Sequence, residues 1–226
     1  MTRNRPLPAP LEEIPCVLVP GRLTPPLDWH AVFGRAGEVE IEIGCGKGRY
    51  LAEAARLRPG SDLVGVERAG KWFRRAVQRA HRSGLPNIRL LQADAFDFLA
   101  RWVPAGSAAA IHLYFPDPWP KQRHGKRRLL QPALYRLAAR ALSTTGRLCL
   151  ASDVEPYFRT AVEEVAATGL FEPEAWPEDA PDRLPTEFAI KYAREGRPLF
   201  YARLVRRAGM ETIHLPVVAS PAGEES

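Results

Sequence analysis

The fold is decided by the run Val39-Glu40-Ile41-Glu42-Ile43-Gly44-Cys45-Gly46-Lys47-Gly48. Its first half alternates and is rich in β-branched residues, which predicts a strand. The glycines that follow predict a turn where the backbone approaches a ligand closely, at the start of a helix expected over 49–57. A strand, a glycine turn and a helix in this order are typical of open parallel sheets, which bind ligands beyond the carboxyl ends of their strands.

Strands and helices continue to alternate along the chain. Further strands are expected over 62–67, 88–91, 108–114 and 146–152. Helices are expected between and after them, over 70–82, 96–102, 131–142 and 155–168. Beyond Gly169 the rhythm changes, and the sequence is compatible with a strand over 171–176, a helix over 186–194 and a final strand over 199–206. The short links predict an α/β fold with a mostly parallel sheet and helices on both faces.

Composition favours one folded domain with flanking segments. The 226 residues are 46% hydrophobic, which is enough to fill a core. We expect an irregular arm over 1–37, rich in proline and arginine, a domain over 38–208 and a tail over 209–226. The chain has no membrane-length apolar run, and residues 1–10 lack the apolar stretch of a secretory signal. A cytoplasmic protein with no membrane partner is therefore expected.

Cysteine and charge usage narrow the possible partners. Cys16, Cys45 and Cys149 are far apart and lack metal-ligand spacing, so we expect reduced thiols and no metal site. Lysine and arginine exceed the acidic residues by 32 to 26, and the net charge of +6 suggests a polyanionic partner. His112 and His214 have apolar neighbours in the sequence and are expected to pack in the core rather than to bind a ligand.

Three kinds of ligand are candidates for the glycine turn. An ATP-binding P-loop needs a spacing that is absent around Lys47. The dinucleotide pattern would need its third glycine where Arg49 stands. The observed pattern, Glu42-x-Gly44-x-Gly46-x-Gly48, resembles the nucleoside-binding loop of S-adenosylmethionine (SAM) methyltransferases.

Acidic residues at successive strand ends support SAM as the cofactor. Glu67 ends the second strand, where its carboxylate can accept hydrogen bonds from both ribose hydroxyls. Asp94 follows the third strand, near the expected adenine amine, and Glu42 lies beneath the turn near the cationic methionine end. With the glycine turn, these three carboxylates favour SAM binding, with S-adenosylhomocysteine as the product.

A second distinctive stretch, Tyr114-Phe115-Pro116-Asp117-Pro118-Trp119-Pro120-Lys121, follows the strand expected over 108–114. Its three prolines hold the backbone extended. A carboxylate, two aromatic residues and a lysine are thereby fixed at a strand end, which predicts an active-site wall. Asp117 can stabilise positive charge that grows on a methylated base, and Trp119 or Phe115 can stack on an extruded base.

This stretch, with Arg123-His124 and Lys126-Arg127-Arg128-Leu129 after it, resembles the signature of bacterial tRNA (guanine-N7)-methyltransferases. The resemblance covers about residues 38–206 and implies a Rossmann-like class I methyltransferase fold of about seven strands with the last antiparallel. It implies methyl transfer from SAM to N7 of a guanine in the variable loop of tRNA, giving 7-methylguanosine. Asp117 would be the catalytic residue, in contact with both SAM and guanine.

The resemblance also implies a set of substrate-binding residues: Lys121, Asp153, Thr186, Glu187, Phe188 and Ala189. The family usually has glutamate where Ala189 stands, and neighbouring Glu187 is a partial substitute for it. Asp153 and Thr186 are also candidate caps for the helices that start near 155 and 187.

Cations on and near the helix expected over 70–82 are a further candidate site for RNA binding. Arg68, Lys71, Arg75, Arg79 and Arg82 share one face by their spacing. Trp72, Ala76 and Ala80 are assigned to an apolar back of the helix. Together with the cations of 121–128, and with Arg3 and Arg5, this face is expected to bind the RNA backbone.

Two other functions stay open at this point. One is a SAM-dependent methyltransferase that acts on another nucleic-acid or protein nitrogen. The other is a non-catalytic RNA-binding module in which the glycine turn is structural. The sequence leaves the oligomeric state, monomer or homodimer, undecided.

Overall fold

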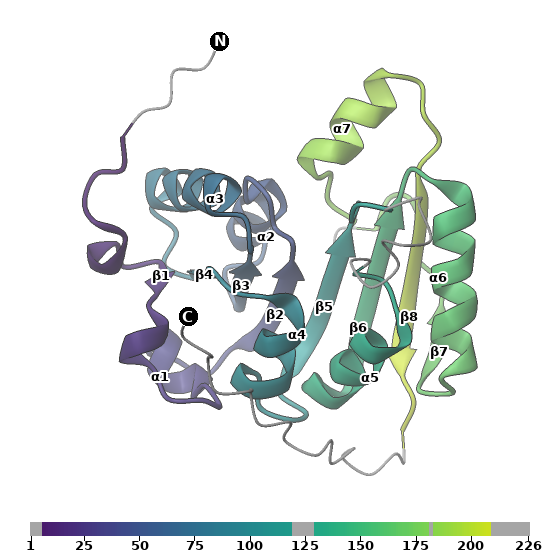
Figure 1. The fold of residues 1–226 in the computed structure, drawn as a ribbon, viewed down its shortest axis with the longest axis horizontal. Coiled ribbons are helices and arrows are strands. Elements are labelled where there is room, and N and C mark those ends of the chain that lie inside the picture. Colours follow the sequence, from purple (N-terminus) through teal and green to yellow (C-terminus); the bar gives the residue numbers. More distant parts are fainter. Residues whose placement is uncertain (1–5, 119–128, 181–182, 209–226) are drawn as a thin grey trace, which may run out of the picture.

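Eight strands form one sheet in the computed structural model, which describes residues 6–118, 129–180 and 183–208 (Figure 1). The strand order is β1-β4-β3-β2-β5-β6-β8-β7. Strand β8 pairs antiparallel with both β6 and β7, and the other neighbouring strands pair in parallel. The strands are β1 (Val17–Leu18), β2 (Glu38–Ile43), β3 (Ser61–Val66), β4 (Ile88–Leu91), β5 (Ala108–Tyr114), β6 (Leu142–Ser152), β7 (Phe171–Glu174) and β8 (Phe200–Arg206). The predicted fold class is therefore confirmed.

Helices follow the strands almost where the sequence predicts them. The helical segments are η1 (Leu11–Glu13), η2 (Pro20–Arg22), α1 (Trp29–Phe33), α2 (Arg49–Leu57), α3 (Gly70–Ser83), α4 (Ala95–Asp97), η3 (Phe98–Trp102), α5 (Pro132–Ala141), α6 (Glu155–Ala167) and α7 (Glu187–Arg194). The segment η3 is a single π-helical turn that continues α4. Among the residues described, no helix is long and apolar enough to cross a membrane.

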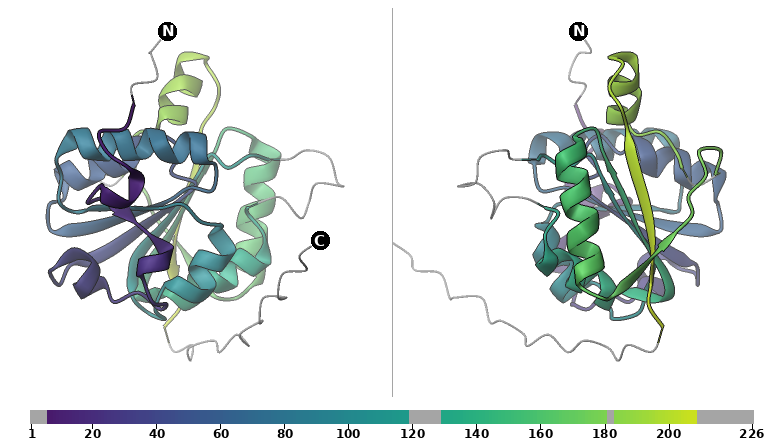
Figure 2. Two further views of the ribbon diagram at one scale, coloured as in Figure 1. Left: turned by 60° about the vertical axis from the view of Figure 1, so that its left-hand side comes forward. Right: turned by 90° about the vertical axis from the view of Figure 1, so that its right-hand side faces the viewer.

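The sheet lies between two layers of helices, with α2 and α3 on one face and α4, α5 and α6 on the other (Figures 1 and 2). Successive strand residues point to opposite faces, so Ile41 and Ile43 join the core under α5 and α6. Glu40 and Glu42 point instead toward the α2 face, where Tyr50 and Leu51 of α2 are packed. Both carboxylates are consequently buried rather than exposed to solvent.

Glu40 belongs to a buried polar network beneath α2. Arg58 donates to it from Nη2 at 2.7 Å, and the Nε2 atom of His112 lies 3.0 Å from the same oxygen, Oε2. The other ring nitrogen of His112 lies 2.8 Å from the hydroxyl of Tyr114, and Tyr50 Oη lies 3.1 Å from Nε2. His112 is buried, as predicted, but its partners are polar, because strand alternation puts it on the same face as Glu40. His214 lies outside the described residues.

We expect this network to make the free energy of unfolding decrease as the pH falls into the acid range. Burial alone would raise the pKa of Glu40, but the hydrogen bonds and charges of His112 and Arg58 lower it from 4.5 to about 2. The stabilisation is complete above pH 4.5 and is lost as pH falls toward 2, by about 3 kcal/mol for one such group. In urea unfolding at several pH values, Glu40→Gln should flatten this slope. Glu53→Gln, in an exposed pair with Arg56, is the control, and equal slopes for all three proteins would contradict the prediction.

The arm contains more regular structure than the sequence suggests. Strand β1 pairs in parallel with β4 at the edge of the sheet, and Leu90 N donates to Cys16 O at 2.7 Å. Asp28 caps α1 by accepting from the backbone N–H of His30 at 2.9 Å. The expectation of an irregular segment over 1–37 thus needs correction for its described part, whereas the boundary at 38 stays a prediction.

Candidate active site

The centre of the sheet brings the two distinctive stretches to the same edge. Strands β2 and β5 are parallel neighbours, and Ile43 is in register with Leu113. The glycine turn after β2 and the segment after β5 therefore leave the sheet side by side. Because β2 leads to β3 and β4 on one side while β5 leads to β6 on the other, this is the topological switch point where open α/β sheets bind ligands.

The conformation of the turn explains its glycines. Gly44, Gly46 and Gly48 have φ angles of 73°, 54° and 67°, in the left-handed region that other residues rarely adopt. A Cβ at Gly48 would also lie 3.2 Å from the Cβ of Ala76 on α3. Gly48 precedes α2 without a side-chain cap, so the first N–H groups of this helix are left for other partners.

Glu67 ties the turn to the end of β3. Its Oε2 accepts from the N–H of Gly46 at 3.0 Å, and its Oε1 accepts from the N–H of Ala69 at 2.8 Å. The carboxylate is therefore held against the glycine turn, as its position in the sequence suggests. A role in binding ribose hydroxyls stays a prediction.

Glu42 lies beneath the turn and has a carboxylate oxygen that accepts no hydrogen bond from the described residues. It is 4% exposed, and its Oε2 has no hydrogen-bond partner in the described part of the chain. Burial, and then the charge of Glu67, raise the pKa of Glu42 well above its ordinary value. A buried carboxylate with a free oxygen suits the cationic end of a ligand, and SAM carries both an ammonium and a sulfonium group. The residues here thus fit the predicted cofactor.

Asp94 combines a structural contact with an exposed position. It caps α4 by accepting from the N–H groups of Phe96 at 2.9 Å and Asp97 at 3.3 Å. Its other oxygen lies 3.9 Å from Arg68, and about half of the side chain is exposed. It stands after β4, beyond β3 in the sheet, where contact with the adenine of SAM stays a prediction.

The segment after β5 is anchored by Phe115. This residue has φ 51°, its N–H donates to Ala151 O at 2.8 Å, and its ring packs against Tyr192 and Tyr201. Because Phe115 is only 8% exposed, the prediction that it stacks on a base is wrong. Asp117, two residues later, is exposed at the sheet edge. The alternative stacking residue, Trp119, lies outside the described residues, as do Lys121 and the cations up to Arg128.

Helix α7 brings the 186–189 segment toward α3. Thr186 caps this helix, as predicted, by accepting from Ala189 N at 3.0 Å. Glu187 forms an ion pair with Arg79 of α3. Burial opposes ionisation of Glu187, but Arg79 and then the charges near the glycine turn lower its pKa. Ala189 is buried and Phe188 is 44% exposed, so these two predicted substrate residues face different surroundings.

Asp153 has a partner that its position in the sequence does not indicate. It forms an ion pair with Arg197, whose guanidinium lies 4.0 Å from the ring centre of Tyr192. Asp153 does not cap α6, because the hydrogen bond there is from Val154 N to Ser152 Oγ at 3.1 Å. Tyr192 lies in the helix predicted over 186–194 and Arg197 lies beyond its end, and no motif marks either residue. The described residues contain no cluster of three or more potential metal ligands.

Known proteins resemble this chain in sequence and in structure. A family model described as "Putative methyltransferase" matches residues 36–202. The tRNA (guanine-N(7)-)-methyltransferase of Anaeromyxobacter dehalogenans is 40% identical over 79% of this chain and 91% of its own length. The Thermus thermophilus protein of the same name is 39% identical over 84% of this chain. The matched region covers only 61% of the length of that relative.

A solved structure supports the fold. A tryptophan-to-alanine mutant of the 16S rRNA (adenine(1408)-N(1))-methyltransferase from Catenulisporales acidiphilia, solved with its cosubstrate SAM, has a TM-score of 0.57 and 18% identity to this chain. The match covers 82% of this chain and 94% of that protein. This likeness shows a shared fold, whereas the sequence matches identify the family. This chain belongs to the tRNA (guanine-N7)-methyltransferase family.

Proposed function

We propose that this chain transfers a methyl group from SAM to N7 of a guanine in the variable loop of tRNA, giving 7-methylguanosine. One observation carries the proposal: the glycine turn over buried Glu42 and the segment of Asp117 leave adjacent strands at the switch point. The names of the relatives from Anaeromyxobacter dehalogenans and Thermus thermophilus support the same reaction. As an enzyme of tRNA, it would work in the cytoplasm.

Residues around the turn hold the cofactor in this proposal. SAM supplies the methyl group when bound and leaves as S-adenosylhomocysteine. Gly44, Gly46 and Gly48 let the backbone approach the ligand, and Glu42 offers its free oxygen to a cationic group. Glu67 and Asp94 present carboxylate oxygens toward the nucleoside from the ends of β3 and β4.

Residues on the β5 side hold the base. Guanine N7 already exposes a lone pair, so the protein does not need a strong base at this step. The Asp117 carboxylate accepts from the guanine edge and stabilises the positive charge that develops on the ring. Positioning of the tRNA is assigned to a wider set of residues: Lys121, Asp153, Thr186, Glu187, Phe188 and Ala189.

Glu67→Ala should weaken SAM binding about 10- to 100-fold, because it removes a charged hydrogen-bond acceptor. It also removes the acceptor that holds Gly46 at 3.0 Å, so the turn loses order. Isothermal titration calorimetry with SAM measures the loss, and Glu53→Ala on α2 is the control. Unchanged binding by the Glu67 variant would remove this residue from the cofactor site.

Nucleoside analysis of tRNA treated with the protein and methyl-labelled SAM tests the function itself. The expected product is labelled 7-methylguanosine from the variable loop. Label in a different nucleoside, or in added protein, would favour a methyltransferase of another nitrogen. Tight tRNA binding without any SAM binding would favour a non-catalytic RNA-binding module.

A further inference from the structure

A groove between the arm and α3 is not used by the proposed chemistry. It has a volume of about 680 Å³, which is large enough for a nucleotide-sized group. Leu7, Pro10 and Leu11 line one wall, which is mainly apolar. Lys71 and Arg75 of α3 are on the opposite wall. The groove therefore combines an apolar side with a cationic side.

Glu12 also lines the groove, but no ion pair joins it to the groove cations in the described part of the chain. Elsewhere on and near α3, Arg79 pairs with Glu187 and Arg68 approaches Asp94. Within the part of the chain that the structure describes, Lys71, Arg74 and Arg75 form no ion pair, although all three line the groove. Uncompensated cations that are held close together repel one another and attract polyanions.

Trp72 extends this surface toward the glycine turn. Its spacing predicts that it belongs to the apolar back of the helix, but 39% of the residue is exposed. The Nζ atom of Lys71 lies 5.1 Å from its ring centre, and the Nζ atom of Lys47 lies 5.7 Å away. An accessible indole between two cations is the combination with which proteins bind single-stranded nucleic acid.

We propose that the surface formed by Lys47, Lys71, Trp72, Arg74 and Arg75, called here the α3 platform, binds the tRNA backbone beside the target nucleotide. This proposal rests on the proposed function. Phosphates lie in the groove against the α3 cations, and an unpaired base stacks on Trp72. Since Lys47 belongs to the glycine turn, the platform extends from the groove to the mouth of the cofactor site.

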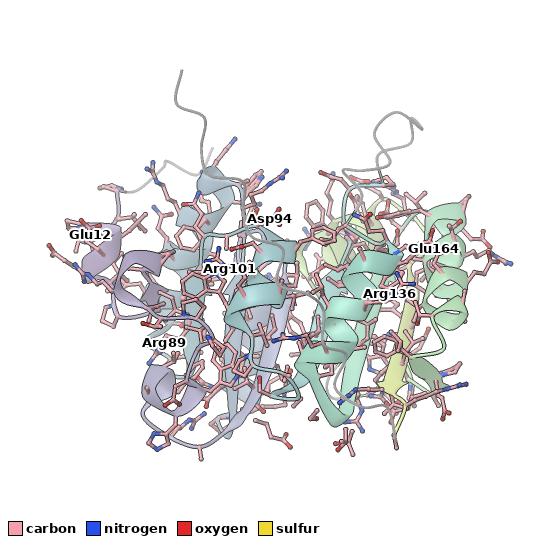
Figure 3. The ribbon with its side chains drawn as sticks, turned by 60° about the horizontal axis from the view of Figure 1, so that its bottom comes forward. Glu12, Arg89, Asp94, Arg101, Arg136 and Glu164 are labelled. Atoms are coloured by element: carbon pink, nitrogen blue, oxygen red, sulfur yellow. The ribbon has the colours of Figure 1, made fainter. Side chains whose placement is uncertain are left out.

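The charge component is tested with the double variant Arg74→Ala/Arg75→Ala. The matched control, Arg56→Ala/Arg136→Ala, removes two arginines from α2 and α5. Glu12 of η1 marks the groove, and Arg136 lies on the opposite side of the molecule from it (Figure 3). Filter binding of a tRNA transcript over a salt series is the measurement. The platform variant should lose about tenfold in affinity near 0.1 M salt and reduce the salt slope by about 1.5, whereas the control stays close to wild type.

The stacking component is tested with Trp72→Ala and Trp72→Phe. The alanine variant should bind tRNA about tenfold more weakly, and the phenylalanine variant should retain most of the affinity because it keeps a ring. Circular dichroism and SAM calorimetry establish that each variant is folded and binds cofactor. Equal losses in platform and control variants, or wild-type affinity for Trp72→Ala, would overturn the proposal.

Different results would refute the proposed reaction and the proposed role of the α3 platform. If the wild-type protein forms 7-methylguanosine while the platform variants bind tRNA normally, the platform is wrong and the proposed function stands. If the wild-type protein labels another nucleoside, the function is wrong, and the binding data still decide whether the platform contacts the RNA.

Discussion

Asp117→Asn should lower kcat for tRNA methylation by about 10²- to 10³-fold, the usual cost of losing one preorganised electrostatic contact. Asparagine keeps the shape of the side chain but cannot supply a negative charge to the ring that becomes cationic. The side chain is exposed, and its segment is fixed by Phe115, so the substitution should not disturb folding. SAM affinity should stay within about threefold of wild type, because the carboxylates of the glycine-turn side are intact.

Single-turnover methylation of a tRNA transcript, with SAM calorimetry on the same preparation, separates these two effects. Glu163→Gln, an acid-to-amide change at an exposed position of α6, is the control and should leave both quantities unchanged. Turnover by Asp117→Asn close to that of the control would remove Asp117 from catalysis. A parallel loss of SAM affinity would instead assign it mainly to the cofactor.

The order of strands and helices could be predicted because each element has a clear local pattern. The predicted range 88–91 and the observed β4 coincide, and α2 has its predicted range, 49–57. Strand β1 escaped prediction because it has two residues and forms only by pairing with β4. Neither a period nor a turn signal can reveal so short a strand, since its stability comes from the neighbour rather than from its own sequence.

The site was predicted less completely than the fold, since its contacts join distant parts of the chain. Trp72 lies outside the buried face of α3, because Phe73, Ala76, Val77 and Ala80 match the helical period more closely and are buried together. The pairs Glu187–Arg79 and Asp153–Arg197 join residues of different elements, and a single sequence contains no signal for them. The polar partners of His112 could not be predicted, because its neighbours in sequence are apolar, whereas its neighbours across the sheet are polar.

Glu42→Gln should affect stability and cofactor binding in opposite directions. The folded-state pKa of Glu42 is raised above its ordinary 4.5, so the folded protein binds more protons than the unfolded chain above that pH. Wild-type stability should therefore fall as pH rises from 4.5, by about 1.4 kcal/mol per unit until the raised pKa is reached. Glutamine has no proton to lose, so the variant should lack this slope and be more stable than wild type at neutral pH.

The same substitution should weaken SAM binding about 10- to 100-fold, because the ligand's cationic end loses a charged partner. Below the raised pKa, Glu42 is protonated in the unliganded protein, and a binding mode that uses its charge releases this proton. In that pH range SAM affinity should increase with pH, and the calorimetric heat should depend on the buffer. Both dependences should disappear in Glu42→Gln, whereas Glu53→Gln should keep them. A variant with unchanged stability and unchanged SAM affinity would contradict this role, because a buried carboxylate with a free oxygen would then serve neither folding nor binding.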